Sequence, residues 1–173
     1  HPDIMQPRRR LLAYKNVAGG NRNDFEKPDN NSWHGMQTSV SAAGNGFLSG
    51  GLYRGVASDA ELVLIQVFGP RGISSKTIID GFDWAIKKKD RYGIRILNVS
   101  LGTAREQSYR TSPIDGVAED AVQAGLVVLV AAGNEGHSPE LNFIAPPASA
   151  PSVITVGGLN DQNSLSLDQV VPY

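Results

Sequence analysis

The sequence contains no cysteine, which excludes disulfide scaffolds, cysteine zinc ligands and a cysteine nucleophile. No apolar run approaches the roughly 18 residues that a membrane-spanning helix needs. Basic side chains are not in excess, because the 16 Lys and Arg residues are balanced by 17 Asp and Glu residues. This balance argues against nucleic-acid and membrane-surface partners, since both select a basic surface. The length of 173 residues, 40% of them hydrophobic, predicts one domain over residues 1–173.

Four short apolar runs predict buried β-strands. They are rich in β-branched residues and do not alternate with polar ones, which is typical of parallel strands covered on both faces. The runs are residues 62–68, 94–101, 126–132 and 153–158. Helical patterns lie between them, and alternation of strands and helices is the order of right-handed βαβ units. The sequence therefore predicts an α/β fold with a doubly wound, mostly parallel sheet and helices on both faces.

Two of the intervening segments have clear helical signals. The apolar residues of segment 75–89 follow the helical period and form one stripe: Ile78, Ile79, Phe82, Ala85 and Ile86. In segment 113–124, Ser112 is the expected N-cap, Asp115 completes a capping box and Gly125 ends the helix. Two other segments, residues 16–33 and 133–152, are interpreted as loops.

Several charged or glycine-rich features are interpreted as structural. Asp115, Glu119 and Asp120 are expected on the outer side of their helix, in water. The basic run at residues 8–10 is expected to be a solvated entrance to a strand. The glycine-rich segment 44–51 lacks the spacing of a phosphate-binding loop. His1 and His137 lack metal-ligand spacing, so no metal site is predicted.

His34 is a candidate general base. It follows a polar loop and opens a stretch of small residues that can form a helix, next to Gly35, which permits close approach. A histidine mounted at a helix start is held rigidly, with its ring facing outward, which suits proton transfer. Taken alone, a surface or capping histidine is the commoner interpretation of such a residue.

Asn134 is a candidate oxyanion donor. It follows the strand 126–132 in a glycine turn, at the carboxyl edge of the predicted sheet, where ligand sites of open α/β sheets gather. Its carboxamide can donate to a developing oxyanion, but an Asn in such a turn also commonly supplies a left-handed conformation.

A strand end with a glycine, at residues 98–102, can accept an extended peptide as an added strand or simply enter a turn.

Taken in order, five segments resemble the subtilases, the subtilisin-like serine protease family. They are HGMQTSVSAAGNG from His34, GVASDAELVLIQVFG from Gly55, ILNVSLG from Ile96, GLVVLVAAGNEG from Gly125 and APPASAPSVITVGG from Ala145. The opening HPDI is similar to the segment that follows the family's catalytic aspartate. The resemblance spans nearly all of the chain and implies the middle of one catalytic domain with a subtilisin-like α/β fold.

The resemblance assigns a role to each matching residue. His34 corresponds to the triad histidine, and Asn134 to the side chain of the oxyanion hole. The segment that pairs with substrate backbone corresponds to Ser100, Leu101 and Gly102. In the family, a pocket binds the substrate residue that precedes the cleaved bond. Its other wall corresponds to Ala131, Ala132 and Gly133. Pro147 corresponds to a proline that follows a cis peptide bond.

The chain also departs from the family pattern. Met36 and Gln37 stand where Thr and a second His are common, and Ser58 replaces a usual proline. The Asp-Thr-Gly or Asp-Ser-Gly motif and the GTSMAxP motif with the nucleophilic serine do not occur. They are expected before His1 and after Tyr173, in the remaining parts of the same catalytic domain. The isolated chain is therefore expected to be inactive, since acyl transfer needs the serine and an oriented histidine.

The resemblance implies that the parent protein is a serine endopeptidase that hydrolyses extended polypeptides through an acyl-serine intermediate. It implies catalysis without a cofactor and allows a structural calcium ion, for which no ligands can be assigned. Many members are secreted, but the compartment stays open. Two alternatives remain. One is a non-catalytic pseudoprotease module that binds polypeptide in the same groove, and a more remote one is a nucleotide-binding α/β domain.

Overall fold

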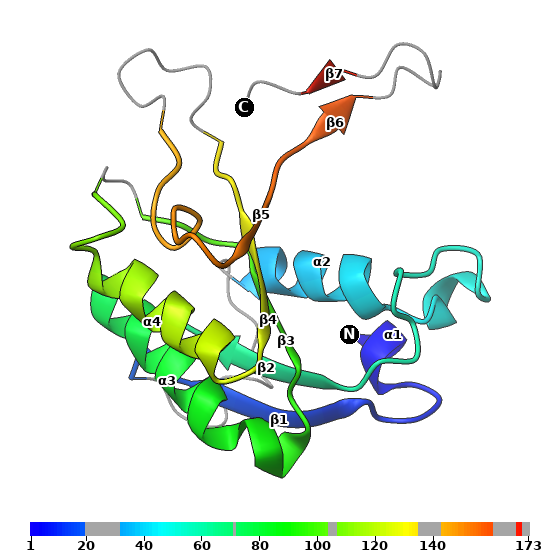
Figure 1. The fold of residues 1–173 in the computed structure, drawn as a ribbon. Helices are drawn as coiled ribbons and strands as arrows, with labels where there is room; N and C mark the ends of the chain where they lie inside the picture. The colour runs from blue at the N-terminus through cyan, green and yellow to red at the C-terminus, as the bar shows by residue number, and fades with distance from the viewer. Residues whose placement is uncertain (20–31, 71, 104–106, 135–142, 161–168, 171–173) are drawn as a thin grey trace. The chain divides into compact units, whose positions relative to one another are not determined.

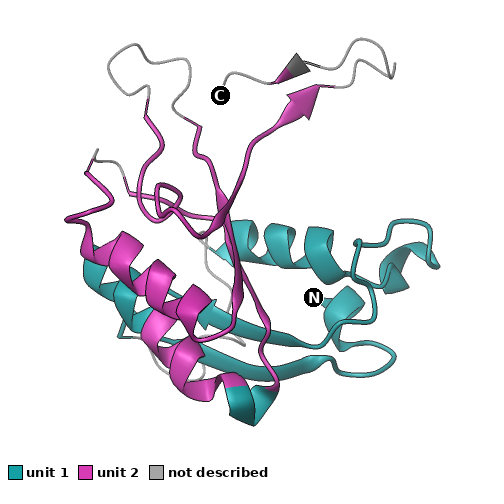
Figure 2. Cartoon of the chain, in the orientation of Figure 1, with its two compact units in different colours: residues 1–81, 90–92 teal, residues 82–89, 93–173 magenta. Residues whose placement is uncertain are grey.

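The computed structural model describes residues 1–19, 32–70, 72–103, 107–134, 143–160 and 169–170. Residues 20–31 and 135–142, including His137, fall within the two predicted loops and lie outside the described residues. The chain forms two compact units, which Figure 2 colours separately. Unit 1 comprises residues 1–81 and 90–92, and unit 2 comprises residues 82–89 and 93–173. The expectation of one domain over the whole chain stays a prediction.

Unit 1 is built around two parallel strands, β1 (Leu11–Asn16) and β2 (Leu62–Gln66). The connection between them contains the short helix η2 (Phe47–Ser49) and helix α2 (Ser32–Ala43), and helix α1 (Pro2–Met5) precedes β1. The apolar run at residues 62–68 predicts β2, whereas β1 has a shorter apolar part and is indicated only by the strand entrance expected at residues 8–10. Helix α3 (Ser75–Tyr92) contributes to both units (Figure 2), and Ile78, Phe82 and Ala85 of its predicted stripe are buried.

Arg10 is buried, with only 4% of its surface exposed, so the expectation of a fully solvated basic run is wrong at this residue. Its guanidinium donates to the backbone oxygens of Asp3 at 2.6 Å, Ala43 at 2.7 Å and Ala60 at 2.8 Å. Arg8 and Arg9 are exposed. The planar fork of arginine carries five donors, which is why one side chain can satisfy carbonyls from three separate segments.

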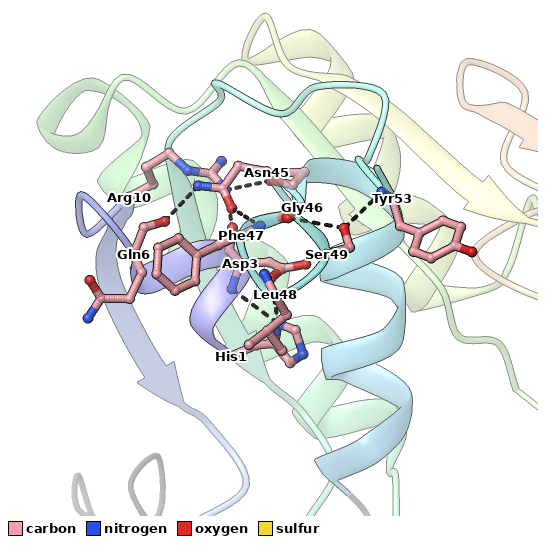
Figure 3. Close-up of polar contacts among 11 residues, drawn as sticks. His1, Asp3, Gln6, Arg10, Asn45, Gly46, Phe47, Leu48, Ser49 and Tyr53 are labelled. Carbon is pink, nitrogen blue, oxygen red and sulfur yellow. Dashed lines mark hydrogen bonds and ion pairs between the residues drawn. The ribbon is translucent and has the colours of Figure 1, made fainter. Parts of the chain in front are cut away.

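The glycine-rich segment 44–51 forms a braced turn next to α1 (Figure 3). Asp3 accepts from the backbone N–H of Leu48 at 3.0 Å, and its own carbonyl accepts from the N–H of Asn45 at 3.0 Å. Gly46 has a φ of 73°, and a Cβ added there would lie 2.7 Å from the carbonyl oxygen of Tyr53. The turn therefore requires glycine at this position for both its conformation and its close packing.

Unit 2 contains a parallel sheet in the order β3–β4–β5 (Figure 1). Its elements are β3 (Ile96–Val99), α4 (Pro113–Gln123), β4 (Val127–Ala131) and β5 (Ile154–Val156). Helix α4 packs on β4 and buries Val128 and Val130 beneath its own apolar stripe. Residues of the opposite face are exposed, and Ile96 is 62% exposed. The mostly parallel α/β architecture predicted from the strand and helix order is present.

Several local predictions for unit 2 are confirmed. Ser112 caps α4, since its Oγ accepts from the N–H of Asp115 at 3.2 Å. The peptide bond between Pro146 and Pro147 is cis. After β5, the short strand β6 (Leu159–Asn160) pairs with β7 (Gln169–Val170) in an antiparallel manner. These two-residue strands are too short for a hydrophobic pattern to reveal them.

Candidate active site

The two predicted walls of the substrate groove begin at one edge of the sheet in unit 2. Val99 pairs with Val130, so β3 and β4 end beside each other. The first wall is Ser100, Leu101 and Gly102, which follow β3 directly, and the second is Ala131, Ala132 and Gly133 at the end of β4. Parallel strands place their carboxyl ends at one edge, where α/β proteins bind ligands. All six residues therefore come from neighbouring strand ends.

The segment after β3 is held at both ends. Ser100 Oγ accepts from the side-chain amide of Asn98 at 2.8 Å. Beyond Gly102, the backbone N–H of Thr103 donates to the carbonyl oxygen of Pro146 at 3.0 Å. Gly102 itself is exposed, and a Cβ added there would lie 3.8 Å from the same carbonyl oxygen. The segment thus lies against the turn with the cis proline, and Gly102 stays exposed.

Asn134 is the first residue after the second wall and its side chain is exposed. The preceding Gly133 has a φ of 107°. A glycine already provides the left-handed conformation that was the alternative role for Asn134, which strengthens the case for a chemical role of the carboxamide. The N–H of Ala132 donates to the carbonyl oxygen of Val156 at 2.9 Å, so the sheet stays hydrogen-bonded up to this turn.

His34 lies in the first turn of α2, as the sequence predicted, and it is exposed. Its ring makes an edge-on contact with Trp33, with ring centroids 5.6 Å apart. A Cβ added at Gly35 would meet no described atom within 4 Å, so no close approach is seen at this glycine among the described residues. An exposed imidazole on a helix start can exchange protons with a reacting group. His34 belongs to unit 1, whereas the other predicted site residues belong to unit 2.

Asp115 is buried, with only 1% of its surface exposed, so the expectation that it lies in water is wrong. Both carboxylate oxygens accept from Ser149 Oγ, at 3.1 and 3.0 Å. Burial raises the pKa of this carboxyl, and the hydrogen bonds from Ser112 and Ser149 partly oppose that change. A signal was present in the sequence, because position 115 lies three residues before the buried Ala118 and so borders the apolar stripe.

Among the described residues, no three His, Asp or Glu side chains cluster closely enough to hold a metal ion. In the same part of the chain, none of the helices has the length and apolar character needed to cross a membrane.

Comparison with known proteins places this geometry in a family. A sequence model of the subtilase family matches residues 5–167. Serine protease AprX of Bacillus subtilis is 33% identical over 97% of this chain and 37% of its own length. Alkaline protease 1 of Aspergillus clavatus is 37% identical over 66% of this chain and 27% of its own length.

Solved structures agree with the sequence matches. Sphericase superposes with a TM-score of 0.68 at 25% identity, covering 100% of this chain and 54% of its own. A psychrophilic protease, S41, gives a TM-score of 0.64 at 25% identity over 78% of this chain and 42% of its own. The fold is thus that of the α/β peptidases. The chain belongs to the subtilase family, and it spans well under two thirds of the curated relatives named above.

Proposed function

We propose that the full gene product is a serine endopeptidase, which hydrolyses peptide bonds in extended polypeptides through an acyl-serine intermediate. The observation that carries this proposal is the sheet edge of unit 2, where Ser100–Gly102 and Ala131–Gly133 leave neighbouring parallel strands and Asn134 follows the second. Family membership supports it. The nucleophilic serine and the triad aspartate are supplied by parts of the same catalytic domain outside these 173 residues.

In this proposal the substrate backbone is bound as an added strand. The segment Ser100–Gly102 offers its backbone groups to an extended peptide, and Gly102, with no side chain, leaves the approach open. Ala131–Gly133 form the facing wall of the pocket for the residue before the cleaved bond. Because backbone groups make most of these bonds, the groove selects extended conformation rather than a particular sequence.

Proton transfer and charge stabilisation fall to the two polar candidates. His34 accepts the proton of the attacking serine hydroxyl and returns it to the leaving amine. Asn134 donates from its carboxamide to the oxyanion of the tetrahedral intermediate, where negative charge develops. The reaction requires no cofactor, and the amino-acid side chains supply each of its proton transfers.

The test is to treat the full gene product with a fluorophosphonate probe and to follow cleavage of an unfolded protein substrate. We expect labelling of one serine and peptide hydrolysis, and loss of both in His34→Ala. Gln37→Ala is the matched control, since it changes another exposed residue of the same helix. Binding of unfolded polypeptide without labelling or cleavage would overturn the proposal in favour of a pseudoprotease. The 173-residue chain alone is expected to show neither labelling nor cleavage.

A further inference from the structure

Asp115 joins helix α4 to the turn that contains the cis proline. Its carboxylate is buried, and it accepts two contacts from Ser149 Oγ, at 3.1 and 3.0 Å. A carboxylate removed from water is costly unless hydrogen bonds compensate it, so a buried acid marks a place where geometry is strongly specified. A shorter polar or apolar side chain could make the contact between helix and turn without the cost of removing a carboxylate from water. Solubility therefore does not explain why position 115 is an aspartate.

The same turn has further anchors on both sides. Glu119, one helical turn after Asp115, accepts from the backbone N–H of Ser152 at 2.8 Å. Thr155 in β5 donates from its hydroxyl to the carbonyl oxygen of Ala148 at 2.7 Å. Residues 145–150 are buried, apart from the half-buried Ser149. Helix α4 and strand β5 thus hold residues 145–152 in one position.

This turn is in direct contact with the segment that we propose binds substrate. The carbonyl oxygen of Pro146 accepts from both the backbone N–H of Thr103, at 3.0 Å, and its hydroxyl, at 3.4 Å. Thr103 follows Gly102, the last residue of that segment. Hydrogen bonds therefore tie Asp115 to Ser149 in the turn and tie Thr103 to Pro146 in the same turn, and the backbone of residues 146–149 joins the two contacts. All of these residues belong to unit 2.

We infer that Asp115 is a positioning residue for substrate binding, which acts through Ser149 and Pro146 to fix the position of Ser100–Gly102. This inference rests on the proposed function, because it concerns the groove of the same site. Fixing the segment before substrate arrives lowers the ordering cost of binding an extended peptide. Asp115 touches neither the substrate nor a reacting atom, so its effect falls on peptide affinity and hardly on the chemical step.

The variants are chosen to separate positioning from general stability. Ser149→Ala removes the donor on the turn and leaves helix α4 unchanged, and Asp115→Asn keeps one acceptor oxygen for Ser149. Asp120→Ala is the matched control, because Asp120 is an exposed acid in the same helix. Two quantities are measured in the full gene product: KM and kcat for an extended peptide, and hydrogen exchange of the Thr103 amide with that of Ala118 as a reference in α4.

We expect Ser149→Ala to raise KM about tenfold with kcat nearly unchanged, the pattern of an interaction made equally with substrate and transition state. The Thr103 amide should exchange about tenfold faster, while Ala118 keeps its protection. Asp115→Asn should keep KM and the exchange rate of the Thr103 amide close to the wild-type values, because it keeps one acceptor for Ser149. Asp120→Ala should match the wild type in both. An unchanged KM and unchanged Thr103 exchange in Ser149→Ala, with only a lower unfolding midpoint, would overturn the inference.

The exchange measurement is independent of catalysis. If the gene product cleaves no peptide, then every variant and the wild type lack a KM, which contradicts the proposed function alone. Faster exchange at Thr103 in Ser149→Ala would still support the positioning role, and unchanged exchange would still reject it. The two proposals can therefore fail separately.

Discussion

The guanidinium of Arg10 donates to the backbone carbonyl of Ala43, the last residue of α2, at 2.7 Å. The last carbonyls of a helix have no partner within it, and a cation there also suits the helix dipole. The same guanidinium binds the carbonyls of Asp3 and Ala60. One buried side chain therefore ties the C-terminal end of α2 to Asp3, which precedes this helix in the chain, and to Ala60, which follows it. His34 lies at the opposite end of the same helix.

Replacing Arg10 should destabilise unit 1. Arg10→Met keeps much of the apolar volume but removes a donor from three carbonyls. The carbonyl of Asp3 still accepts from the N–H of Asn45 and Ala60 is exposed, so the main loss is at the buried Ala43, where an unsatisfied carbonyl costs about 1–3 kcal/mol. We expect the free energy of unfolding to fall by about 1–3 kcal/mol. Urea denaturation measures it, with exposed Arg8→Met as the control, expected within about 0.5 kcal/mol of the wild type. Equal, small effects for both variants would contradict the bracing role of Arg10.

Two glycine-to-alanine substitutions should have opposite effects. At Gly46, with its φ of 73°, an added Cβ would lie 2.7 Å from a backbone oxygen, so Gly46→Ala should destabilise by about 1–3 kcal/mol. Gly116 is exposed in helix α4, and an added Cβ there meets nothing within 4 Å. Gly116→Ala should therefore stabilise by up to about 1 kcal/mol, because alanine is the better helix former. Thermal unfolding gives both signs, and a stabilising Gly46→Ala would show that the turn is built differently.

The buried carboxyl of Asp115 should make stability depend on pH in an unusual direction. Burial raises its folded pKa above the ordinary value of 3.8, and the carboxylate of Glu119 adds to this. Between the two pKa values the folded state binds more protons than the unfolded state, so stability decreases as pH rises through this window. The stability contributed by Asp115 is thus fully present below pH 3.8 and is lost as pH rises through the folded pKa.

Comparison with Asp115→Asn isolates this effect, because Asn does not titrate. The free energy of unfolding of the wild type minus that of Asp115→Asn should increase as the pH is lowered from 7 towards 3.8 and level off below it. Denaturant titrations at several pH values measure the difference. A difference that instead increases with rising pH would mean that hydrogen bonds to the carboxylate outweigh its burial.

Much of the fold is predictable because its signals are local. The β-branched runs of β2 to β5, the Ser112 cap and the apolar stripe of α3 each depend on a few neighbouring residues. Arg10 and Asp115 could not be assigned in this way. Their burial depends on partners 33 or more residues away in sequence, namely Ala43 for Arg10 and Ser149 for Asp115. A charged residue is mostly exposed unless such a partner exists, so local reasoning places it in water.

The sequence predicts where the candidate site residues of unit 2 lie better than it predicts what each side chain does. Parallel topology alone brings the residues after β3 and β4 to one sheet edge. Pattern by itself left His34 and Asn134 open, because surface histidines and turn asparagines are common. The resemblance to subtilases implies the roles that we propose for them, and the structure adds the exposure of both residues and the φ of Gly133.

The role of Asn134 can be tested by two substitutions in the full gene product. If its carboxamide donates to the oxyanion, Asn134→Ala should lower kcat by about 100- to 1000-fold, as loss of one such donor does. KM should barely change, since this bond forms chiefly in the transition state. The effect differs from the one expected for Ser149→Ala, where KM changes and kcat does not.

Asn134→Gly distinguishes an oxyanion role from a turn-shaping role better than Asn134→Ala does. Glycine enters left-handed conformations easily, so the turn should keep its shape and the fold should survive whichever role Asn134 has. If Asn134 only shaped the turn, this variant would keep near-normal turnover. Because Gly133 already has the positive φ in this turn, we expect instead that Asn134→Gly loses as much kcat as Asn134→Ala. Near-normal kcat with unchanged unfolding would remove the oxyanion role and leave His34 as the one candidate for a catalytic side chain among the described residues.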